Sequence, residues 1–298
     1  MGSDGGIAAT LLARCTFPSA GTAVTCAASG GADSTALLVL AVAAGLDVTA
    51  IHVDHGLREG SAAEADIVRA HALRLGAAFR AERVDVIDGP NLEARSRQAR
   101  YGVLPDDVLT GHTADDQAET VLVNLLRGAS TSGLAAIRPG HRHPILGLRR
   151  SETVELCAGL RLAVVHDPSN LDPRHLRNRV RHELLPLMAQ LSQRDLAPVL
   201  ARQAGLARDD DDLLNTLAAA LDPTDAQQLA AAPVALARRA VRQWLGGAHP
   251  PDAATVERVL QVARGHSLAT EIAGGRRVSR HQQRLSLGPD EQVSQRVT

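Results

Sequence analysis

The chain has 298 residues, of which 32 are basic and 33 are acidic, and its formal net charge at pH 7 is -1. Every basic residue is arginine, because the sequence contains no lysine. This absence excludes a Walker A loop, whose lysine reaches the terminal phosphates of a nucleotide. It also excludes catalysis through a Schiff-base or self-adenylylated lysine. The length predicts about two domains, and no apolar run is long enough to predict a membrane span.

Cysteines and aromatic residues are both scarce. Cys15, Cys26 and Cys157 lie far apart in the sequence, which favours a reducing compartment over a disulfide framework. We therefore expect a cytoplasmic protein with no signal peptide. The aromatic residues are Phe17, Phe79, Tyr101 and Trp244. With so few rings, stacking of successive bases is not expected, so a nucleic acid would have to be bound by clusters of arginine.

The first part of the chain alternates short apolar runs with segments of helical pattern. Strands are predicted at residues 23–28, 48–53, 83–87 and 108–110, and helices at 34–44, 62–75, 91–103 and 113–126. This alternation predicts an α/β fold with a doubly wound, mostly parallel sheet. In such sheets ligands bind beyond the carboxyl ends of the strands. We therefore expect the chemistry to lie in the loops after the first, second and fourth strands.

The composition and the predicted structure change in the remainder of the chain. Residues 130–143 are rich in Gly, Pro and Arg and predict an irregular segment, and residues 176–191 have helical spacing with many arginines. From about residue 200 the sequence is rich in alanine and helical, and it ends in two short runs around a Gly-Gly pair that predict a β-hairpin. We expect a catalytic domain over residues 1–198 and a smaller, mainly helical domain over residues 199–298.

The first expected strand leads directly into a loop and a helix. The loop is formed by Ser29, Gly30, Gly31, Ala32, Asp33 and Ser34. Consecutive glycines let the backbone approach an anion closely, and the amides at the helix start point toward it. Asp33 is unfavourable beside bare phosphate unless a metal lies between them, so it implies Mg²⁺. The alternative is a glycine turn that merely caps a helix; the whole pattern favours phosphate binding.

The second strand ends in polar residues that face the expected cleft. We assign His52 and Asp54 to nucleotide binding on this placement. The alternative is that these histidines bind zinc, but His52 and His55 lack further metal ligands at the usual spacing. A further alternative is a loop with solvated histidines. On the helix predicted at 91–103, Arg97 and Arg100 are three residues apart and share a face, where they suit phosphate binding unless they are only solvated.

The most informative pattern is residues 111–120, which read GHTADDQAET. Helical spacing brings His112, Asp115, Asp116 and Glu119 near one face. Thr113 and Asp116 fit an N-terminal capping pair, which explains Asp116 but leaves Glu119 unexplained. Carboxylates facing an anion-binding cleft predict a cation, either a metal or the ammonium group of an amino substrate.

Together these strings resemble the N-type ATP pyrophosphatases, and within them the tRNA(Ile)-lysidine synthetase family. The resemblance rests on SGGADS, HVDHGLR, RQARY and GHTADDQAET, and it continues in DPSN at residues 167–170 and RNRVR at residues 177–181. SGGADS identifies only the superfamily, whereas GHTADDQAET with the SN and RN pairs is more specific. The C-terminal third matches weakly, and residues 144–146 depart from the usual RPLL string.

The resemblance implies a ligase that uses ATP and Mg²⁺ to join L-lysine to C2 of the wobble cytidine of a tRNA(Ile) with a CAU anticodon. It implies that Arg97, Arg100 and Gly111 contact the nucleotide. It implies that Asp33 holds the metal, with His112 a candidate base. The residues expected to bind lysine or the RNA are Asp115, Asp116, Glu119, Arg177, Asn178 and Arg181. Whether the carboxylates bind lysine or metal stays open, as does a homodimer.

Two groups of arginine are expected to meet the RNA. One group comprises Arg174, Arg177, Arg179 and Arg181, and the other comprises Arg276, Arg277, Arg280 and Arg284. The alternative for both is that they are solvated charges. Two other functions compete with the ligase: a tRNA thiolase, which generally needs the paired cysteines that this chain lacks, and a non-catalytic tRNA-binding protein. Intact Asp33, Asp115, Asp116 and Glu119 argue against the second.

Overall fold

The computed structural model describes residues 4–54, 61–84, 95, 99, 102–247 and 251–289. The chain divides into two compact units, Met1–Gly205 and Leu206–Thr298, and each is described by itself. The boundary predicted at residue 198 lies near the start of helix α10 (Ala197–Ala219), which contributes residues to both units.

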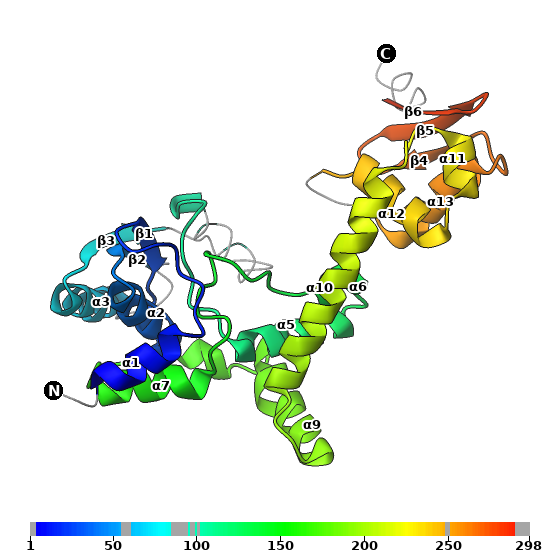
Figure 1. The fold of residues 1–298 in the computed structure, drawn as a ribbon. Helices are drawn as coiled ribbons and strands as arrows, with labels where there is room; N and C mark the ends of the chain where they lie inside the picture. The colour runs from blue at the N-terminus through cyan, green and yellow to red at the C-terminus, as the bar shows by residue number, and fades with distance from the viewer. Residues whose placement is uncertain are drawn as a thin grey trace. The chain divides into compact units, whose positions relative to one another are not determined.

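The first unit is built on a parallel sheet of three strands (Figure 1). The strands are β1 (Ala23–Ala27), β2 (Asp47–Asp54) and β3 (Ala78–Arg83), in the order β1-β2-β3. The crossovers are α2 (Ala32–Ala43) and α3 (Ser61–Leu75). The predicted alternation of strands and helices, and with it the α/β class and the parallel sheet, is therefore confirmed.

The fourth predicted strand is reduced to a single bridge beside β1. Leu109 pairs with Cys26 in parallel orientation. The Leu109 amide donates to the Thr25 carbonyl at 2.8 Å, and the Ala27 amide donates to the Leu109 carbonyl at 2.9 Å. Thus β1 has the 108–110 segment on one side and β2 on the other. The strand order therefore reverses at β1. Ligands of doubly wound sheets bind beyond the carboxyl ends of the strands at such a reversal.

The third strand lies earlier in the sequence than predicted. We expected it at residues 83–87, but β3 ends at Arg83 and begins at Ala78. Residues 85–87 of the predicted range lie outside the described residues. The start of β3 was missed because AFRAER carries charged side chains, as edge strands commonly do, and is not an apolar run. Of the helix expected at residues 91–103, all but residues 95, 99, 102 and 103 fall outside the described residues.

The main core of this unit lies between the sheet and a layer of helices. Leu37 and Leu40 of α2 are fully buried and pack with Cys26 of β1 and Leu156 of α7 (Arg150–Gly159). Helix α1 (Asp4–Leu12) contributes Leu11 to the same cluster. Burial of each such side chain stabilises the fold by about 1.5–3 kcal/mol. This core fixes the start of α2, where the glycine loop ends.

The other helical elements of the first unit follow the bridge segment. They are α5 (Ala114–Leu126), α6 (Thr131–Leu134), a 3₁₀ turn (Pro168–Leu171), α8 (Leu176–Arg179), a π turn (Val180–Leu184) and α9 (Leu185–Ser192). Val180 is buried with Leu122 and Val123 of α5. This packing places Arg177 and Arg181 beside the acidic face of α5.

The second unit combines short helices with an antiparallel sheet (Figure 1). Besides the end of α10, its elements are α11 (Ala226–Ala231), α12 (Val234–Trp244), α13 (Ala253–Ala263), β4 (Ala269–Ile272), β5 (Arg276–His281) and β6 (Arg284–Pro289). The predicted hairpin is confirmed as β4 and β5, and β6 adds a third strand. Gly274 and Gly275 form its turn with φ of +81° and +62°, which glycine adopts without strain.

The cysteines and the helices bear on two expectations from the sequence, the lack of a disulfide framework and the lack of a membrane span. Cys15, Cys26 and Cys157 are all free thiols. Among the described residues, no helix is long and apolar enough to cross a membrane.

Candidate functional site

The loop after β1 has the backbone geometry of an anion-binding turn. Gly30 has φ +83°, and a Cβ there would lie 2.6 Å from Cγ2 of Val165. Gly31 is the N-cap of α2. The Ser34 hydroxyl donates to the Gly31 carbonyl at 3.0 Å and lies 3.2 Å from the Ser29 amide, so it closes the loop on itself. The first amides of α2 therefore have no helical acceptor and are available to an anion.

A second glycine brings the next loop against the first. A Cβ on Gly111 would lie 2.7 Å from the carbonyl oxygen of Asp33 and 3.0 Å from the amide nitrogen of Ser34. Only glycine permits this approach of the two backbones. The loops after β1 and after the 108–110 segment thus meet at the carboxyl edge of the sheet, as the sequence predicted for the ligand site.

Substitution of Gly30 by alanine is expected to lower the thermal stability and to weaken ATP binding. The positive φ costs a non-glycine residue about 1–2 kcal/mol, and the added methyl group must displace Val165. Thermal denaturation and equilibrium dialysis with labelled ATP measure the two effects. Gly31→Ala is the matched control for stability, because its φ is -68° and its Cβ would lie 3.6 Å from the Ser29 hydroxyl. Equal stability of the two variants would contradict the steric argument.

Four acidic residues of the site lie on two helices and converge on arginines from elsewhere in the unit. The Arg150 guanidinium, at the start of α7, donates to Asp33 at 3.2 Å, to Asp116 at 3.0 Å and to Glu119 at 3.0 Å. One side chain therefore joins the glycine loop of α2 to the acidic face of α5. Thr153 adds a hydrogen bond to the other oxygen of Asp33 at 2.5 Å.

Glu119 is the centre of this cluster. Its side chain is 1% exposed. The Arg177 Nε donates to one of its oxygens at 2.8 Å, and Arg181 donates to both, at 2.6 and 2.9 Å. Arg177 also donates to Asp116 at 2.9 Å. With Arg150, the cluster contains three guanidinium groups and the three carboxylates of Asp33, Asp116 and Glu119, so its formal charges balance.

Asp115 belongs to a separate ion pair beside this cluster. Arg149 binds it through two parallel hydrogen bonds of 3.0 Å, and the Arg150 amide donates to it at 2.8 Å. Arg149 also pairs with Asp195. Paired contacts of this kind fix the orientation of both groups. Asp115 therefore tethers the start of α7, which carries Arg150, to α5.

The predicted capping pair at the start of α5 is confirmed. The Thr113 amide and hydroxyl both donate to Asp116, at 2.9 and 3.0 Å. One oxygen of Asp116 thus caps the helix while the other binds Arg150 and Arg177. The same residue serves the local fold and the cluster.

The carboxylates differ in their affinity for a proton. For Asp33, burial is the largest effect and raises the pKa above its ordinary value of 3.8. Burial acts on Asp116 in the same direction, but Arg150 and Arg177 outweigh it and hold the pKa below 3.8. Hydrogen bonds from Arg149 and Arg150 likewise outweigh burial at Asp115 and lower its pKa. On acidification, Asp33 is therefore protonated before Asp115 and Asp116.

His112 is paired with a second histidine that the sequence analysis missed. The two rings lie edge to face with centroids 4.9 Å apart. Nδ1 of His112 and Nδ1 of His143 lie 2.8 and 2.7 Å from the Thr110 hydroxyl. The Thr110 hydroxyl therefore holds the two rings against each other.

The remaining predicted residues are placed as follows. His52 is buried, and its Nδ1 lies 2.9 Å from the Ala28 carbonyl, which ties β2 to the start of the glycine loop. Asp54 ends β2 and is half-buried. Asn178 donates to the carbonyls of Ser169 and Asp172 at 2.8 and 2.9 Å, so it fixes the 3₁₀ turn. Arg97 and Arg100 lie outside the described residues.

Sequence reasoning missed Arg149, Arg150, Thr153 and His143. The first three lie at the start of α7, more than 30 residues beyond the acidic residues of α5, with no local signature. Their partners are set by tertiary packing alone. The available signal was the pair of arginines at the start of α7. Cations are unfavourable at the amino end of a helix, so the pair indicates acidic partners nearby.

Asp33 is the residue whose chemistry suits a magnesium ion. Its two oxygens accept hydrogen bonds from Thr153 and Arg150, and a carboxylate offers about four acceptor positions, so acceptor positions remain. Among the described residues, no three side chains of His, Cys, Asp or Glu converge in a way suited to a metal ion. Mg²⁺ is commonly held by one or two carboxylates together with substrate phosphates and water, and Asp33 could supply one such carboxylate.

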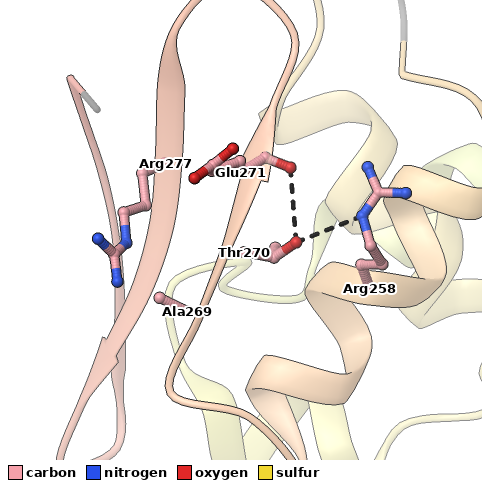
Figure 2. A pocket seen from close by; sticks show the side chains of 5 residues that line it. All are labelled: Arg258, Ala269, Thr270, Glu271 and Arg277. Carbon is pink, nitrogen blue, oxygen red and sulfur yellow. Dashed lines mark hydrogen bonds between the residues drawn. The ribbon is translucent and has the colours of Figure 1, made fainter. Parts of the chain in front are cut away.

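A cavity of about 460 Å³ lies in the second unit (Figure 2). Figure 2 shows Arg258 of α13 reaching Thr270 of β4, a contact of 3.3 Å, with Arg277 on the neighbouring strand. Glu271 lies opposite Arg277 in the strand register. Of the other predicted arginines, Arg280 bonds to the Ala263 and Gln282 carbonyls and to Gln283, Arg284 to Asp222 and Thr224, and Arg276 to the Ala273 carbonyl. Arg277 is thus the member of that group that lines the cavity.

Two family models match the chain in the order of its two units. A PP-loop domain matches residues 8–188, which include the glycine loop and the cluster around Glu119. A TilS substrate binding domain matches residues 225–286, which include α11 to α13 and most of the antiparallel sheet.

Two similar proteins of known sequence are tRNA(Ile)-lysidine synthases, and one similar solved structure is a tRNA thiolase. The chain is 44% identical over 253 residues to a tRNA(Ile)-lysidine synthase of Nocardia farcinica, covering 79% of this chain and 80% of that protein. It is 44% identical over 243 residues to one of Rhodococcus erythropolis, covering 76% and 75%. Among solved structures, the U34-tRNA thiolase NcsA of Methanococcus maripaludis has a TM-score of 0.54 at 17% identity, covering 69% of this chain and 78% of that one. The last likeness concerns the fold alone.

Proposed function

The chain belongs to the tRNA(Ile)-lysidine synthase family, and from this we propose that it joins L-lysine to the wobble cytidine of a tRNA(Ile) with a CAU anticodon, at the expense of ATP. The observation that carries the proposal is the meeting of the glycine loop with the cluster around Glu119. Arg150 joins the two at distances of 3.0 and 3.2 Å. The expected phosphate site and the expected site for an amine would thus be next to each other.

The first step is adenylation of the cytidine. The C2 carbonyl oxygen attacks the α-phosphorus of ATP, and the bond to the β-phosphate breaks to release pyrophosphate. The amides that follow Gly30 and Gly31 would hold the departing phosphates, aided by the dipole of α2. Asp33 would hold Mg²⁺, which when bound neutralises charge on those phosphates. His52 ties β2 to the start of the glycine loop, and Gly111 lets the second loop approach it.

The second step is attack by lysine. Its side-chain amine forms the new bond to C2, loses a proton, and AMP leaves with the former carbonyl oxygen. Asp116 and Glu119 have the charge to bind the ammonium group of lysine. Arg150, Arg177 and Arg181 occupy their oxygens, so lysine binding requires that at least one guanidinium withdraws. The released arginine would then suit the lysine carboxylate.

The proton of the attacking amine requires an acceptor. His112 immediately precedes Thr113, the N-cap of α5, four residues before Asp116, and its ring lies against that of His143. We assign the base to this pair. A cytoplasmic location, a homodimer and the nucleotide contacts of Arg97 and Arg100 remain predictions.

The direct test is transfer of radiolabelled lysine to RNA. With ATP, the unaltered protein is expected to label a tRNA(Ile) transcript with the CAU anticodon, and mass analysis of the nucleosides is expected to show lysidine. A methionine tRNA transcript is the control and is expected to stay unlabelled. Pyrophosphate release that ignores both lysine and the tRNA would indicate a different enzyme, and no release at all would indicate a binding protein.

A further inference from the structure

The first unit contains a second cavity, beside the cluster around Glu119. Its volume is about 610 Å³, within the range of binding sites for small molecules and nucleotides. It is lined by residues of α5, α8 and the 136–143 segment. The residues of the glycine loop, 29–34, do not line it, so it is distinct from the expected site of the ATP phosphates.

The charge of this cavity is entirely of one sign. Arg127, Arg138, Arg142 and Arg177 line it together with the pair His112 and His143, and among the described lining residues none is acidic. Arg127, Arg138 and Arg142 are exposed. Arg177 is already engaged by Glu119 and Asp116. The other three guanidinium groups still exceed what the single carboxylate of an amino acid requires, whereas successive phosphates of a nucleic acid strand need several.

The walls of the cavity are held in place by hydrogen bonds. The side-chain amide of Gln117 on α5 binds both the amide and the carbonyl of Ile137, at 2.9 and 3.1 Å. Asn124 donates to the Gly133 carbonyl at 2.7 Å. The Thr110 amide donates to the Arg142 carbonyl at 2.9 Å. These bonds fix the backbone that carries Arg138 and Arg142 while leaving their side chains exposed.

Arg177 connects the cavity to the cluster, because it lines the cavity and donates to Glu119 at 2.8 Å. A strand bound in the cavity would therefore lie beside the carboxylates expected to hold the amine. We propose that this cavity binds the phosphodiester backbone of the single-stranded RNA segment whose base is modified, an inference that rests on the proposed function. Contacts of arginine with phosphate would take the place of aromatic stacking on bases, for which the chain has too few rings.

The test is the salt dependence of RNA binding by the double variant Arg127→Gln/Arg142→Gln. Binding of the CAU-anticodon transcript is measured by filter retention over a series of KCl concentrations. Affinity is expected to fall about tenfold or more, and the slope of log affinity against log salt is expected to become shallower by about 0.7 for each lost phosphate contact. ATP binding, measured by equilibrium dialysis, and the melting temperature are expected to stay unchanged, because both side chains are exposed.

Arg80→Gln is the matched control, since Arg80 is a 62% exposed arginine on β3, at the edge of the sheet opposite the 108–110 segment. It is expected to leave RNA affinity and slope unaltered. An unchanged affinity and slope in the double variant would overturn the inference, as would a loss of ATP binding with RNA binding intact. Failure of the proposed function has a different signature, namely that the unaltered protein transfers no lysine to RNA.

Discussion

An Asp33→Asn variant is expected to lose tRNA-dependent pyrophosphate release by at least about a hundredfold, the effect of removing one group that stabilises a developing charge. The substituted asparagine would keep the size of the side chain and an acceptor for Thr153, but not the charge that Mg²⁺ requires. Binding of the tRNA is expected to be unchanged, because the RNA contacts proposed above lie elsewhere. Pyrophosphate release and filter binding measure the two properties on the same preparation.

The fold of this variant is expected to be intact. Burial raises the pKa of Asp33 above 3.8, so the folded state binds its proton more tightly than the unfolded state does. The free energy of unfolding therefore falls as pH rises through the interval between 3.8 and the raised value, and the charged form costs stability at neutral pH. A neutral asparagine avoids that cost, but it also leaves the three guanidinium groups of the cluster facing two carboxylates. Because these two effects oppose each other, the melting temperature at pH 7 is expected to stay close to that of the unaltered protein.

Asp47→Asn is the control for the same chemical change. Asp47 is exposed and begins β2, at the amino edge of the sheet, so its replacement is expected to leave pyrophosphate release unaltered. Full activity of Asp33→Asn would contradict the assignment of Asp33 to the metal. Loss of activity accompanied by a lower melting temperature would point instead to a structural role.

Local signals predicted the parts of the site that lie on one element each. The glycine loop was predictable because a strand, two glycines and a helix start are consecutive, and the start of α5 was predictable because Thr113 and Asp116 form a capping pair with fixed spacing. Both signals depend on residues a few positions apart. The sheet was predictable for the same reason, except for β3, whose charged alternation AFRAER conceals a strand at an edge.

The partners of these residues were not predictable, because they depend on tertiary packing. The arginines of RNRVR looked like a basic patch for RNA, but Arg177 and Arg181 bind Glu119, while Arg174 pairs with Asp172 and Arg179 with Glu183. A row of arginines in a sequence does not reveal which acids it meets. In the same way, the sequence does not reveal that the guanidinium of Arg150 lies beside Asp116 and Glu119, where a metal or the ammonium group of a substrate was expected.

A Glu119→Gln variant is expected to be destabilised by about 3–5 kcal/mol, the usual effect of removing one partner from buried charges. The substitution would leave three guanidinium groups facing two carboxylates in a site where Glu119 is 1% exposed. In a unit of this size the melting temperature falls by about 2–4 °C for each kcal/mol, so thermal denaturation should detect a decrease of about 10 °C. Glu155→Gln, an exposed position on α7, is expected to change stability by less than about 0.5 kcal/mol.

The double variant Glu119→Gln/Arg181→Gln separates the structural role of Glu119 from its role in catalysis. Removal of Arg181, which donates to both oxygens of Glu119, restores the balance of charge at two arginines and two acids. Most of the lost stability is therefore expected to return, as a coupling energy of about 0.5–3 kcal/mol in a double-mutant cycle. Lysine transfer is expected to be absent in the double variant as in Glu119→Gln, because both lack the carboxylate for the ammonium group. If transfer returned together with stability, Glu119 would be a structural counter-ion, and Asp116 alone would have to bind the amine.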